Sequence, residues 1–324
     1  MRPRFVHLLV GAFALVILVG CGEEQSSPQQ TTVAAPYIVV VNNPLLYFAR
    51  RLIGAEVEVR LLAPPGSDPA MWRPTVAEAL QLQGAELVLL NGAGYSGWLD
   101  KVSLSSNKLV VTSEAAKDQW IELDDQITHS HGPGGEHAHG GYASTTWMDM
   151  SLARVQAKAV ANALQKRWPQ HSATITANLR TLSADLNGLG EGYRRQARRL
   201  AERQLVYSHP VFQYFERRYH LPGRSLHWEP DAMPSDEQWL ELQQAISPDA
   251  LFIWEAAPDS AISARLEKLN VEYVVVAPGA HRGNVDWLAI QCANIASLAG
   301  TRVSGAQTAA VNHFVAPGAL HPCE

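Results

Sequence analysis

The chain has 324 residues, of which 47% are hydrophobic and 18% charged, and its formal net charge is −5 at pH 7. This composition is that of a globular protein, and it excludes a disordered chain, collagen-like repeats, a coiled coil and a protein with many membrane spans. The acidic balance argues against nucleic acid as a partner, because phosphate-binding surfaces normally carry a basic excess. The length allows two domains of about 150 residues each.

The N-terminus has the pattern of an export signal. Arg2 and Arg4 precede an apolar run over residues 8–20, which is too short to span a bilayer as a helix. The run leads into LVGC at residues 18–21, a pattern that lipoprotein signal peptidase cuts in bacteria. The alternative is an ordinary secretory signal in which a cysteine happens to follow the cleavage site.

Cleavage at this pattern predicts three consequences. Residues 1–20 are a signal peptide, Cys21 carries the lipid, and residues 21–36, rich in Gln, Ser, Thr and Pro, form a flexible tether. We therefore expect an exported protein that is lipid-anchored in the cell envelope, on the periplasmic side in a Gram-negative cell.

Export also bears on the two later cysteines, Cys292 and Cys323. An oxidising compartment favours a disulfide, which would join the C-terminal tail to a late helix. Two buried or free thiols are the alternative, and the sequence alone does not decide between them.

From residue 37 onward, short β-branched runs alternate with helical patterns, as expected for βα units around parallel sheets. Four strands are predicted in each half, at 37–41, 57–62, 86–90 and 109–112, and then at 204–207, 225–227, 250–254 and 273–276. Helices are predicted between them at 44–53, 75–83, 211–219, 235–246, 261–269 and 285–298. The pattern predicts an N-terminal α/β lobe over 37–170 and a C-terminal α/β lobe over 204–324.

A long helical segment is predicted between the lobes. One helix covers residues 151–168, and apolar residues then recur every three or four positions over 175–200. We assign 171–203 as a linker helix, whose apolar stretch would be about 39 Å long at 1.5 Å per residue. Gly188, Gly190 and Gly192 weaken a helix, so a kink or break is an open possibility there.

The most specific polar feature is a histidine-rich loop at residues 129–139. It contains His129, His131, Glu136, His137 and His139 on a glycine-rich backbone. Imidazoles in such a chain suit a borderline metal such as zinc, copper or nickel. A disordered polar loop without a ligand role is the alternative. His209 is a second candidate, because it follows a predicted strand at the edge where ligands bind in parallel sheets. The alternative is a hydrogen-bonded polar residue near the core without a ligand role.

Several segments resemble the zinc- and manganese-binding solute-binding proteins of bacterial ABC importers, over nearly the whole mature chain. They are residues 61–69 (LLAPPGSDP), 85–92 (AELVLLNG), 98–99, the histidine-rich loop, 147–149 (WMD), 208–215 (SHPVFQYF) and 234–236. The resemblance implies two four-stranded parallel-sheet α/β lobes, bridged by a rigid backbone helix, with a ligand cleft between them.

The resemblance also implies four metal ligands in the cleft, and only one of them is present. Three expected positions carry Ala70, Thr145 and Ala277, and His209 fills the remaining one. A single imidazole cannot hold zinc in its usual tetrahedral site, so we expect the cleft site to be degraded or rebuilt.

Other residues are candidates for rebuilding it. Glu255 and His281 lie on loops of the second lobe, and Asp68 and the histidine-rich loop lie in the first. The alternative is that Glu255 pairs with an arginine and that His281 is solvated. Trp72, Trp98, Trp147 and Trp254 could line the cleft or pack in the core.

The function expected from this resemblance is an envelope lipoprotein that captures or buffers a metal ion, zinc before manganese, for an ABC permease in the inner membrane. The alternative is a divergent paralogue whose cleft binds a small organic ligand or a protein. An enzyme is not expected, because the chain lacks the nucleophile elbow, the phosphate-binding loop and the zinc-protease helix motif.

Overall fold

The computed structural model of the protein describes residues 35–123, 129–130, 136–137, 141–229, 232–300 and 323. The predicted signal peptide, Cys21 and most of the tether lie outside this range. Within it, no helix is both long enough and apolar enough to cross a membrane.

The N-terminal half is built on a four-stranded parallel sheet with the order β2-β1-β3-β4. Its strands are β1 (Tyr37–Val40), β2 (Glu58–Leu61), β3 (Leu87–Leu90) and β4 (Leu109–Val111), and its helices are α1 (Asn43–Ile53) and α2 (Val76–Gly84). The central strands β1 and β3 are apolar because helices and loops cover both faces. α1 starts at an Asn42 cap with Pro44 in its first turn, and α2 starts with a capping box from Thr75 and Glu78.

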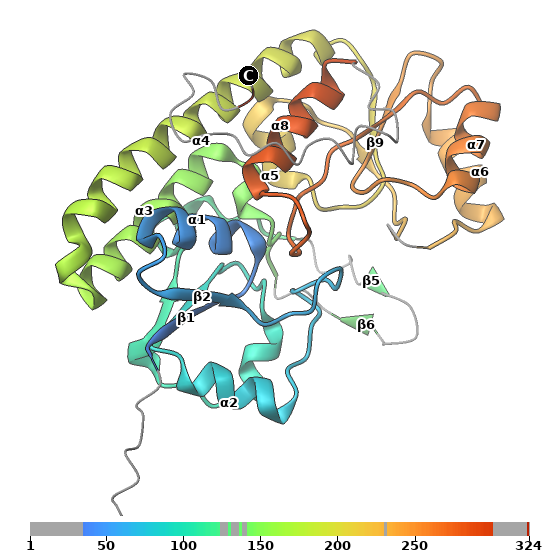
Figure 1. Cartoon of the computed structure of the whole chain (residues 1–324). Coiled ribbons are helices and arrows are strands. Elements are labelled where there is room, and N and C mark those ends of the chain that lie inside the picture. Colours follow the sequence, from blue (N-terminus) through green and yellow to red (C-terminus); the bar gives the residue numbers. More distant parts are fainter. Residues whose placement is uncertain are drawn as a thin grey trace, which may run out of the picture. The chain divides into compact units, whose positions relative to one another are not determined.

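The C-terminal half repeats this plan with a second parallel sheet of order β10-β9-β7-β8 (Figure 1). Its strands are β7 (Leu205–Tyr207), β8 (Arg224–Ser225), β9 (Leu251–Trp254) and β10 (Tyr273–Val275). Its helices are α5 (Gln213–Tyr219), α6 (Asp236–Ala245), α7 (Ser260–Lys268) and α8 (Trp287–Leu298). Two four-stranded α/β lobes are thus confirmed.

Short elements complete the chain. Short 3₁₀ segments lie at Gly97–Lys101, Ser106–Lys108, Glu114–Gln119, Thr146–Met148 and Pro169–His171. In the histidine-rich loop, β5 (His129–Ser130) pairs antiparallel with β6 (Glu136–His137).

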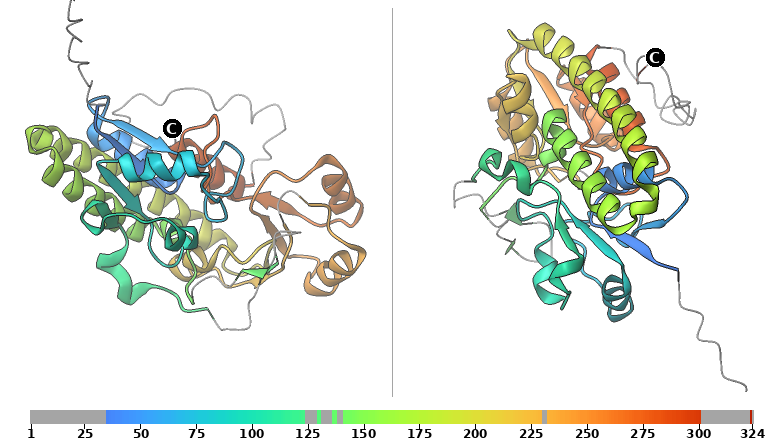
Figure 2. Two further views of the ribbon diagram at one scale, coloured as in Figure 1. Left: turned by 90° about the horizontal axis from the view of Figure 1, so that it is seen from below. Right: turned by 90° about the vertical axis from the view of Figure 1, so that its left-hand side faces the viewer.

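Two long helices connect the lobes, α3 (Met150–Arg167) and the 29-residue α4 (Ser172–Leu200), which is about 43 Å long. They pack against each other, and α4 also contacts α1 in the first lobe and α5 and α8 in the second (Figure 2). An ion pair of 2.8 Å joins Asp185 to Arg51 of α1. At the other end the Tyr193 hydroxyl donates to Gln291 Oε1 of α8 at 2.7 Å. One helix therefore holds both lobes.

α4 is continuous, and the possible kink at its glycines is not present. Gly190 and Gly192 are buried. A Cβ built on Gly192 would lie 2.7 Å from Ile295 Cδ1 of α8, and one on Gly190 would lie 3.5 Å from Met150 Cβ. These two glycines therefore allow close helix packing, and the packing offsets their weak helix propensity.

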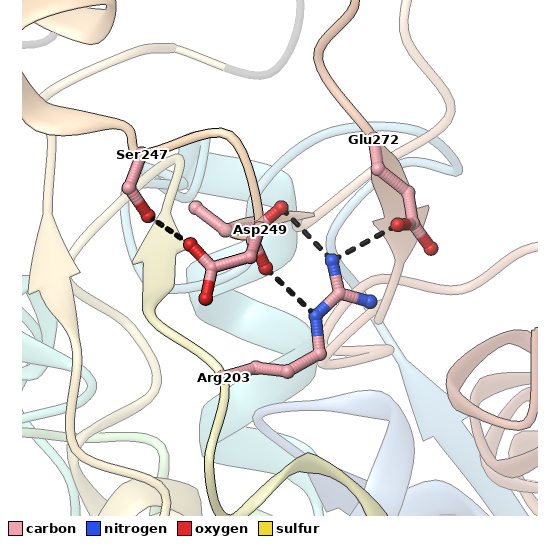
Figure 3. A network of polar contacts seen from close by, with 5 residues as sticks. Arg203, Ser247, Asp249 and Glu272 are labelled. Carbon is pink, nitrogen blue, oxygen red and sulfur yellow. Dashed lines mark hydrogen bonds and ion pairs between the residues drawn. The ribbon is translucent and has the colours of Figure 1, made fainter.

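The end of α4 is fixed to the second sheet by one arginine (Figure 3). The Arg203 guanidinium donates to the carbonyls of Asp249 and Ala250 at 3.0 Å each, and to Glu272 Oε2 at 2.9 Å. Ser247 donates to Asp249 Oδ1 at 2.6 Å and supports the same turn. Because Asp249 and Ala250 precede β9 and Glu272 precedes β10, this network orients α4 relative to both strands.

The apolar core runs through both lobes. Its larger cluster contains residues of both sheets together with α1, α3, α4 and α8. A smaller cluster in the second lobe is rich in aromatic rings, including Trp228, Trp239 and Trp254. Of the four tryptophans considered for the cleft, Trp98, Trp147 and Trp254 are buried core residues, and Trp72 is partly exposed.

A disulfide joins Cys292 of α8 to Cys323, with the two Cα atoms 5.1 Å apart. It ties the C-terminal end of the chain to a helix that packs on α4.

The close packing at Gly192 predicts a position-specific cost. Gly192→Val should lower the free energy of unfolding by about 1–3 kcal/mol, because the new methyl groups overpack the contact with Ile295. Gly188→Val, at a partly exposed position of the same helix, is the matched control and should have little effect. Urea unfolding measures both, and adding Ile295→Ala to Gly192→Val should recover part of the loss. Equal losses in the two valine variants would contradict the packing explanation.

Burial of one carboxyl group predicts a pH-dependent stability. Glu216 of α5 accepts a hydrogen bond from the Gly223 amide at 3.2 Å, and burial raises the pKa of its carboxyl from 4.5 to about 7. Between these two values the unfolded chain releases the proton while the folded protein keeps it, so stability falls as the pH rises through this window.

Glu216→Gln keeps an acceptor for Gly223 and removes the buried charge. We expect the variant to be more stable than the parent at pH 8 by about 1 kcal/mol, after allowing for partial exposure, and nearly equal to it at pH 4.5. Thermal unfolding at the two pH values measures this difference. A gain of the same size at both pH values would show that the charge is not its cause.

Candidate functional site

A buried polar network lies at the carboxyl end of the first sheet and is centred on Asn91, the residue after β3. Its Oδ1 accepts from Gln156 Nε2 at 3.0 Å and from Asn42 Nδ2 at 3.3 Å, and its Nδ2 donates to the Ser144 carbonyl at 2.8 Å. Each of these side chains is buried and hydrogen-bonded, as a stable interior network requires. The network fixes the segment around Ser144, which contains one of the expected ligand positions.

That segment is bonded directly to the second lobe. The Thr145 hydroxyl donates to the Val211 carbonyl at 2.6 Å, and the Tyr214 hydroxyl donates to the Ala143 carbonyl at 3.0 Å. The Trp147 indole N–H donates to the Pro278 carbonyl at 2.9 Å. At the start of α1, the Asn43 amide donates to the Ala280 carbonyl at 2.8 Å. We call these four bonds the lobe seam.

Thr145 and Ala277, which occupy two of the expected ligand positions, lie in or next to the seam. Thr145 forms a hydrogen bond across the lobes at the position where the family resemblance implies a histidine. Ala277 lies next to Pro278, the acceptor of another seam bond, and its own backbone is held by both groups of the Asn294 amide at 2.8 Å. Direct hydrogen bonds therefore join the lobes at Thr145 and beside Ala277, two positions where the resemblance implies metal ligands.

His209 lies at the end of β7 and is only 6% exposed. Ser208 positions it: the Ser208 amide donates to the Ile253 carbonyl at 2.9 Å, and its hydroxyl accepts from the Glu255 amide at 3.1 Å. Because β7 and β9 are neighbours in the sheet, the residues that follow them are brought together. The pairing thus puts the loop that carries His209 beside the loop that carries Glu255.

The imidazole meets two acceptors on one side. His209 Nδ1 lies 3.3 Å from the Trp228 carbonyl and 3.9 Å from Glu255 Oε1. The Glu255 side chain is 13% exposed and the His209 side chain 7% exposed. Metal-binding histidines commonly donate one ring N–H to a carbonyl or carboxylate, which orients the other nitrogen toward the metal. His209 Nδ1 lies near one carbonyl and one carboxylate, and the sequence did not point to the Trp228 carbonyl.

The remaining candidates are dispersed. Asp68 is exposed, and its Oδ1 accepts from the Ala70 amide at 2.9 Å. His281 lies on an exposed loop. His129 pairs with His137 in the β5–β6 register, whereas His131 and His139 lie outside the described residues. No group of three or more potential metal ligands occurs in the part of the chain that the structure describes.

A buried tyrosine at the same cleft edge was not considered from the sequence. Tyr95 is 4% exposed, its ring packs on Trp147 at 5.3 Å, and its hydroxyl has no hydrogen-bond partner within the described ranges. Burial, and then the charge of Asp68, raise the pKa of the Tyr95 hydroxyl. The loop Asn91-Gly92-Ala93-Gly94 that precedes it was the available signal, because such loops lie at the ligand edge of parallel sheets.

Among solved structures, two fits illustrate the fold. The Zn(II)-bound ZnuA-like domain of Streptococcus pneumoniae AdcA aligns with a TM-score of 0.69 and 19% identity, over 82% of this chain and 98% of that one. The periplasmic zinc-binding protein TroA of Treponema pallidum aligns with a TM-score of 0.67 and 20% identity, over 82% and 98%. Both likenesses support the two-lobe α/β fold.

Sequence comparison finds related proteins. A putative metal-binding protein of Treponema pallidum is 26% identical over 224 residues, which are 67% of this chain and 70% of that protein. The zinc-binding lipoprotein AdcA of Streptococcus pneumoniae is 20% identical over 270 residues, which are 81% of this chain and 52% of AdcA, so the chain spans about half of that relative.

The sequence pattern of the ZnuA family, described as zinc-uptake complex component A, periplasmic, matches residues 38–300. This range includes nearly all of both sheets, the connecting helices, and His209, Glu255 and His281. The protein therefore belongs to the ZnuA family of solute-binding proteins.

Proposed function

We propose that the protein captures a divalent metal ion, zinc before manganese, outside the cytoplasm and delivers it to an ABC permease in the inner membrane. The observation that carries this proposal is the environment of His209, a buried imidazole whose Nδ1 faces a carbonyl and a carboxylate. Family membership and the names of the relatives support the same conclusion. The proposal includes a lipid anchor at Cys21 and binding without catalysis.

In this proposal the cleft site is rebuilt around His209, with Glu255 as its orienting partner. A carboxylate beside Nδ1 fixes the ring and makes the other nitrogen a better donor to a metal. His281 is a weaker candidate, because its loop is exposed. One imidazole still needs further ligands, since zinc in proteins takes about four.

We propose that the histidine-rich loop supplies those ligands. Both of its ends are held by a short antiparallel ladder, in which the Leu123 amide donates to the Gly141 carbonyl and the Ala143 amide to the Ile121 carbonyl, each at 2.8 Å. Ala143 and Thr145 are then bonded to Tyr214 and Val211 in the lobe that carries His209. Both bonded ends of the loop thus lie next to residues of the lobe seam, and we propose that His129, His131, His137 and His139 complete the ligand set.

A zinc titration of metal-stripped protein lacking residues 1–21 tests the proposal. We expect one ion to bind, and we expect His209→Ala to weaken its binding by more than about 100-fold. Glu255→Gln should weaken it by about 10- to 100-fold, the usual effect of losing a partner that orients a ligand. Deleting residues 132–139 should also weaken it, whereas His281→Ala serves as the exposed control.

The outcomes separate the parts of the site. Binding that is lost with His209→Ala and with the deletion indicates one site shared by the cleft and the loop. Binding lost with the deletion alone would assign the ion to the loop and reject the cleft site. An absence of binding in the parent protein would reject the metal proposal and favour the divergent paralogue.

Restoring two expected ligands should strengthen the cleft site. Ala70→His with Thr145→His adds two imidazoles on the first lobe, and we expect at least a tenfold gain in zinc affinity in the protein without residues 132–139. Loss of the Thr145–Val211 hydrogen bond should lower the free energy of unfolding by about 1 kcal/mol. Isothermal titration and urea unfolding measure the two effects, and Ala70→Gln with Thr145→Gln is the matched control. Unchanged affinity would show that positions 70 and 145 do not face His209.

A further inference from the structure

A pocket lies between the first helix, α1, and the loop that leads into the last one, and His209 is not among the residues that line it. It has a volume of about 340 Å³ and is lined on one side by α1 and on the other by residues 282–287. α1 and α8 pack side by side, and α1 belongs to the first lobe while α8 belongs to the second (Figure 1). The pocket therefore has one wall from each lobe.

Three arginines line this pocket, Arg50 and Arg51 from α1 and Arg282 from the loop. Arg51 is neutralised by Asp185 at 2.8 Å and donates to the Tyr47 hydroxyl at 2.7 Å. Arg50 donates to the Val59 carbonyl at 3.1 Å, which does not neutralise its charge. Arg282 is exposed, and no ion pair to it is found within the described ranges.

The charges of Arg50 and Arg282 repel each other across the pocket. Burial, and then the nearby Arg282, lower the pKa of the Arg50 guanidinium, and Glu58 opposes this effect. Glu58 itself is paired with Arg60. Arg50 and Arg282 thus both line the pocket, and neither forms an ion pair with a carboxylate within the described ranges.

The carboxylates nearest the pocket have other roles. Asp185 pairs with Arg51. Asp286 lines the pocket but caps α8, where its Oδ1 accepts from the Leu288 amide at 2.8 Å. Burial raises the pKa of the Asp286 carboxyl, and the two backbone donors of the cap oppose this effect. Counting both carboxylates as ionised, the three arginines still leave the pocket with a net positive charge.

The floor of the pocket is rigid. The Trp287 ring packs on Tyr47 at 5.8 Å and on Phe48 at 5.3 Å, and Trp287 is 1% exposed. The Asn43 bond to the Ala280 carbonyl fixes the loop against α1. Because α1 is held in place and Arg50 is hydrogen-bonded to the Val59 carbonyl, this arginine is positioned before any ligand binds, which lowers the entropic cost of binding.

We infer that this pocket binds an oxyanion of the phosphate class that carries two negative charges, held between Arg50 and Arg282. Guanidinium groups present paired N–H donors that match the oxygen spacing of phosphate. A doubly charged anion is favoured over chloride or acetate, because it interacts with both cations. The shared chemistry fits either free phosphate outside the cytoplasm or the phosphomonoester headgroup of a lipid such as phosphatidic acid.

Titration with inorganic phosphate tests the inference on metal-free protein, so its result does not depend on the metal site. The measurement is made at pH 7.5 and low ionic strength, with chloride at equal ionic strength as the reference. We expect saturable binding to the parent protein, at least a fivefold loss in Arg50→Gln and in Arg282→Gln, and no detectable binding in the double variant. Arg180→Gln is the matched control, because Arg180 is exposed on α4 and does not line the pocket.

A second arm distinguishes the two sources of phosphate. The same variants are sedimented with vesicles that contain phosphatidic acid and, for comparison, with vesicles of phosphatidylcholine alone. Binding to phosphatidic acid that requires Arg50 and Arg282 but is not matched by free phosphate would assign the lipid headgroup.

Two results would overturn the inference: no arginine-dependent binding in either arm, or binding that the double variant retains. Equal melting temperatures of the variants without anion would show that any loss of binding is not a loss of folding.

Discussion

The structure depends on one continuous apolar core that does not stop at the boundary between the lobes. In a protein made of two independent domains, each sheet would bury its own cluster and the connection would be exposed. Here α4 contributes buried residues along its whole length, and α1 and α8 pack on it from opposite lobes. Moving the lobes apart as rigid bodies would expose this shared apolar surface, at roughly 25 cal/mol per Å². Motion that preserves the core is therefore confined to loops and side chains.

The joined lobes suggest a physical role for Thr145 and for the segment beside Ala277, two positions where the resemblance implies metal ligands. With the lobes held by their core and by the seam, a bound ion is not needed to keep them together. Thr145 takes part in a hydrogen bond in a place where the family resemblance implies a metal ligand. In the second lobe, His209 is buried with its Nδ1 beside the Trp228 carbonyl and the Glu255 carboxylate, which is the environment on which the proposed metal site depends.

Much of the fold was predictable from local pattern, because alternating apolar runs and helix caps are encoded by neighbouring residues. All eight sheet strands of the two lobes lie where the β-branched runs predict them, within one or two residues. The fate of the α4 glycines was not predictable, since it depends on Ile295, about a hundred positions away. The proximity of His209 to Glu255 follows from a strand order that the sequence does not state, and the Trp228 carbonyl belongs to a residue without a motif. The pocket between α1 and residues 282–287 joins segments more than 200 positions apart, so no local pattern could indicate it.

The lobe seam has an asymmetry that affects how the chain tolerates change. In its bonds the acceptors are main-chain carbonyls, of Val211, Ala143, Pro278 and Ala280, which every amino acid possesses. Three of the donors are side chains, those of Thr145, Tyr214 and Trp147, and the fourth is a backbone amide. Substitution at an acceptor position therefore leaves the bond chemically intact, whereas substitution at one of the three donor side chains removes it. The seam is therefore sensitive to substitution at three donor positions and tolerant at its four acceptor positions, while the shared core holds the lobes in either case.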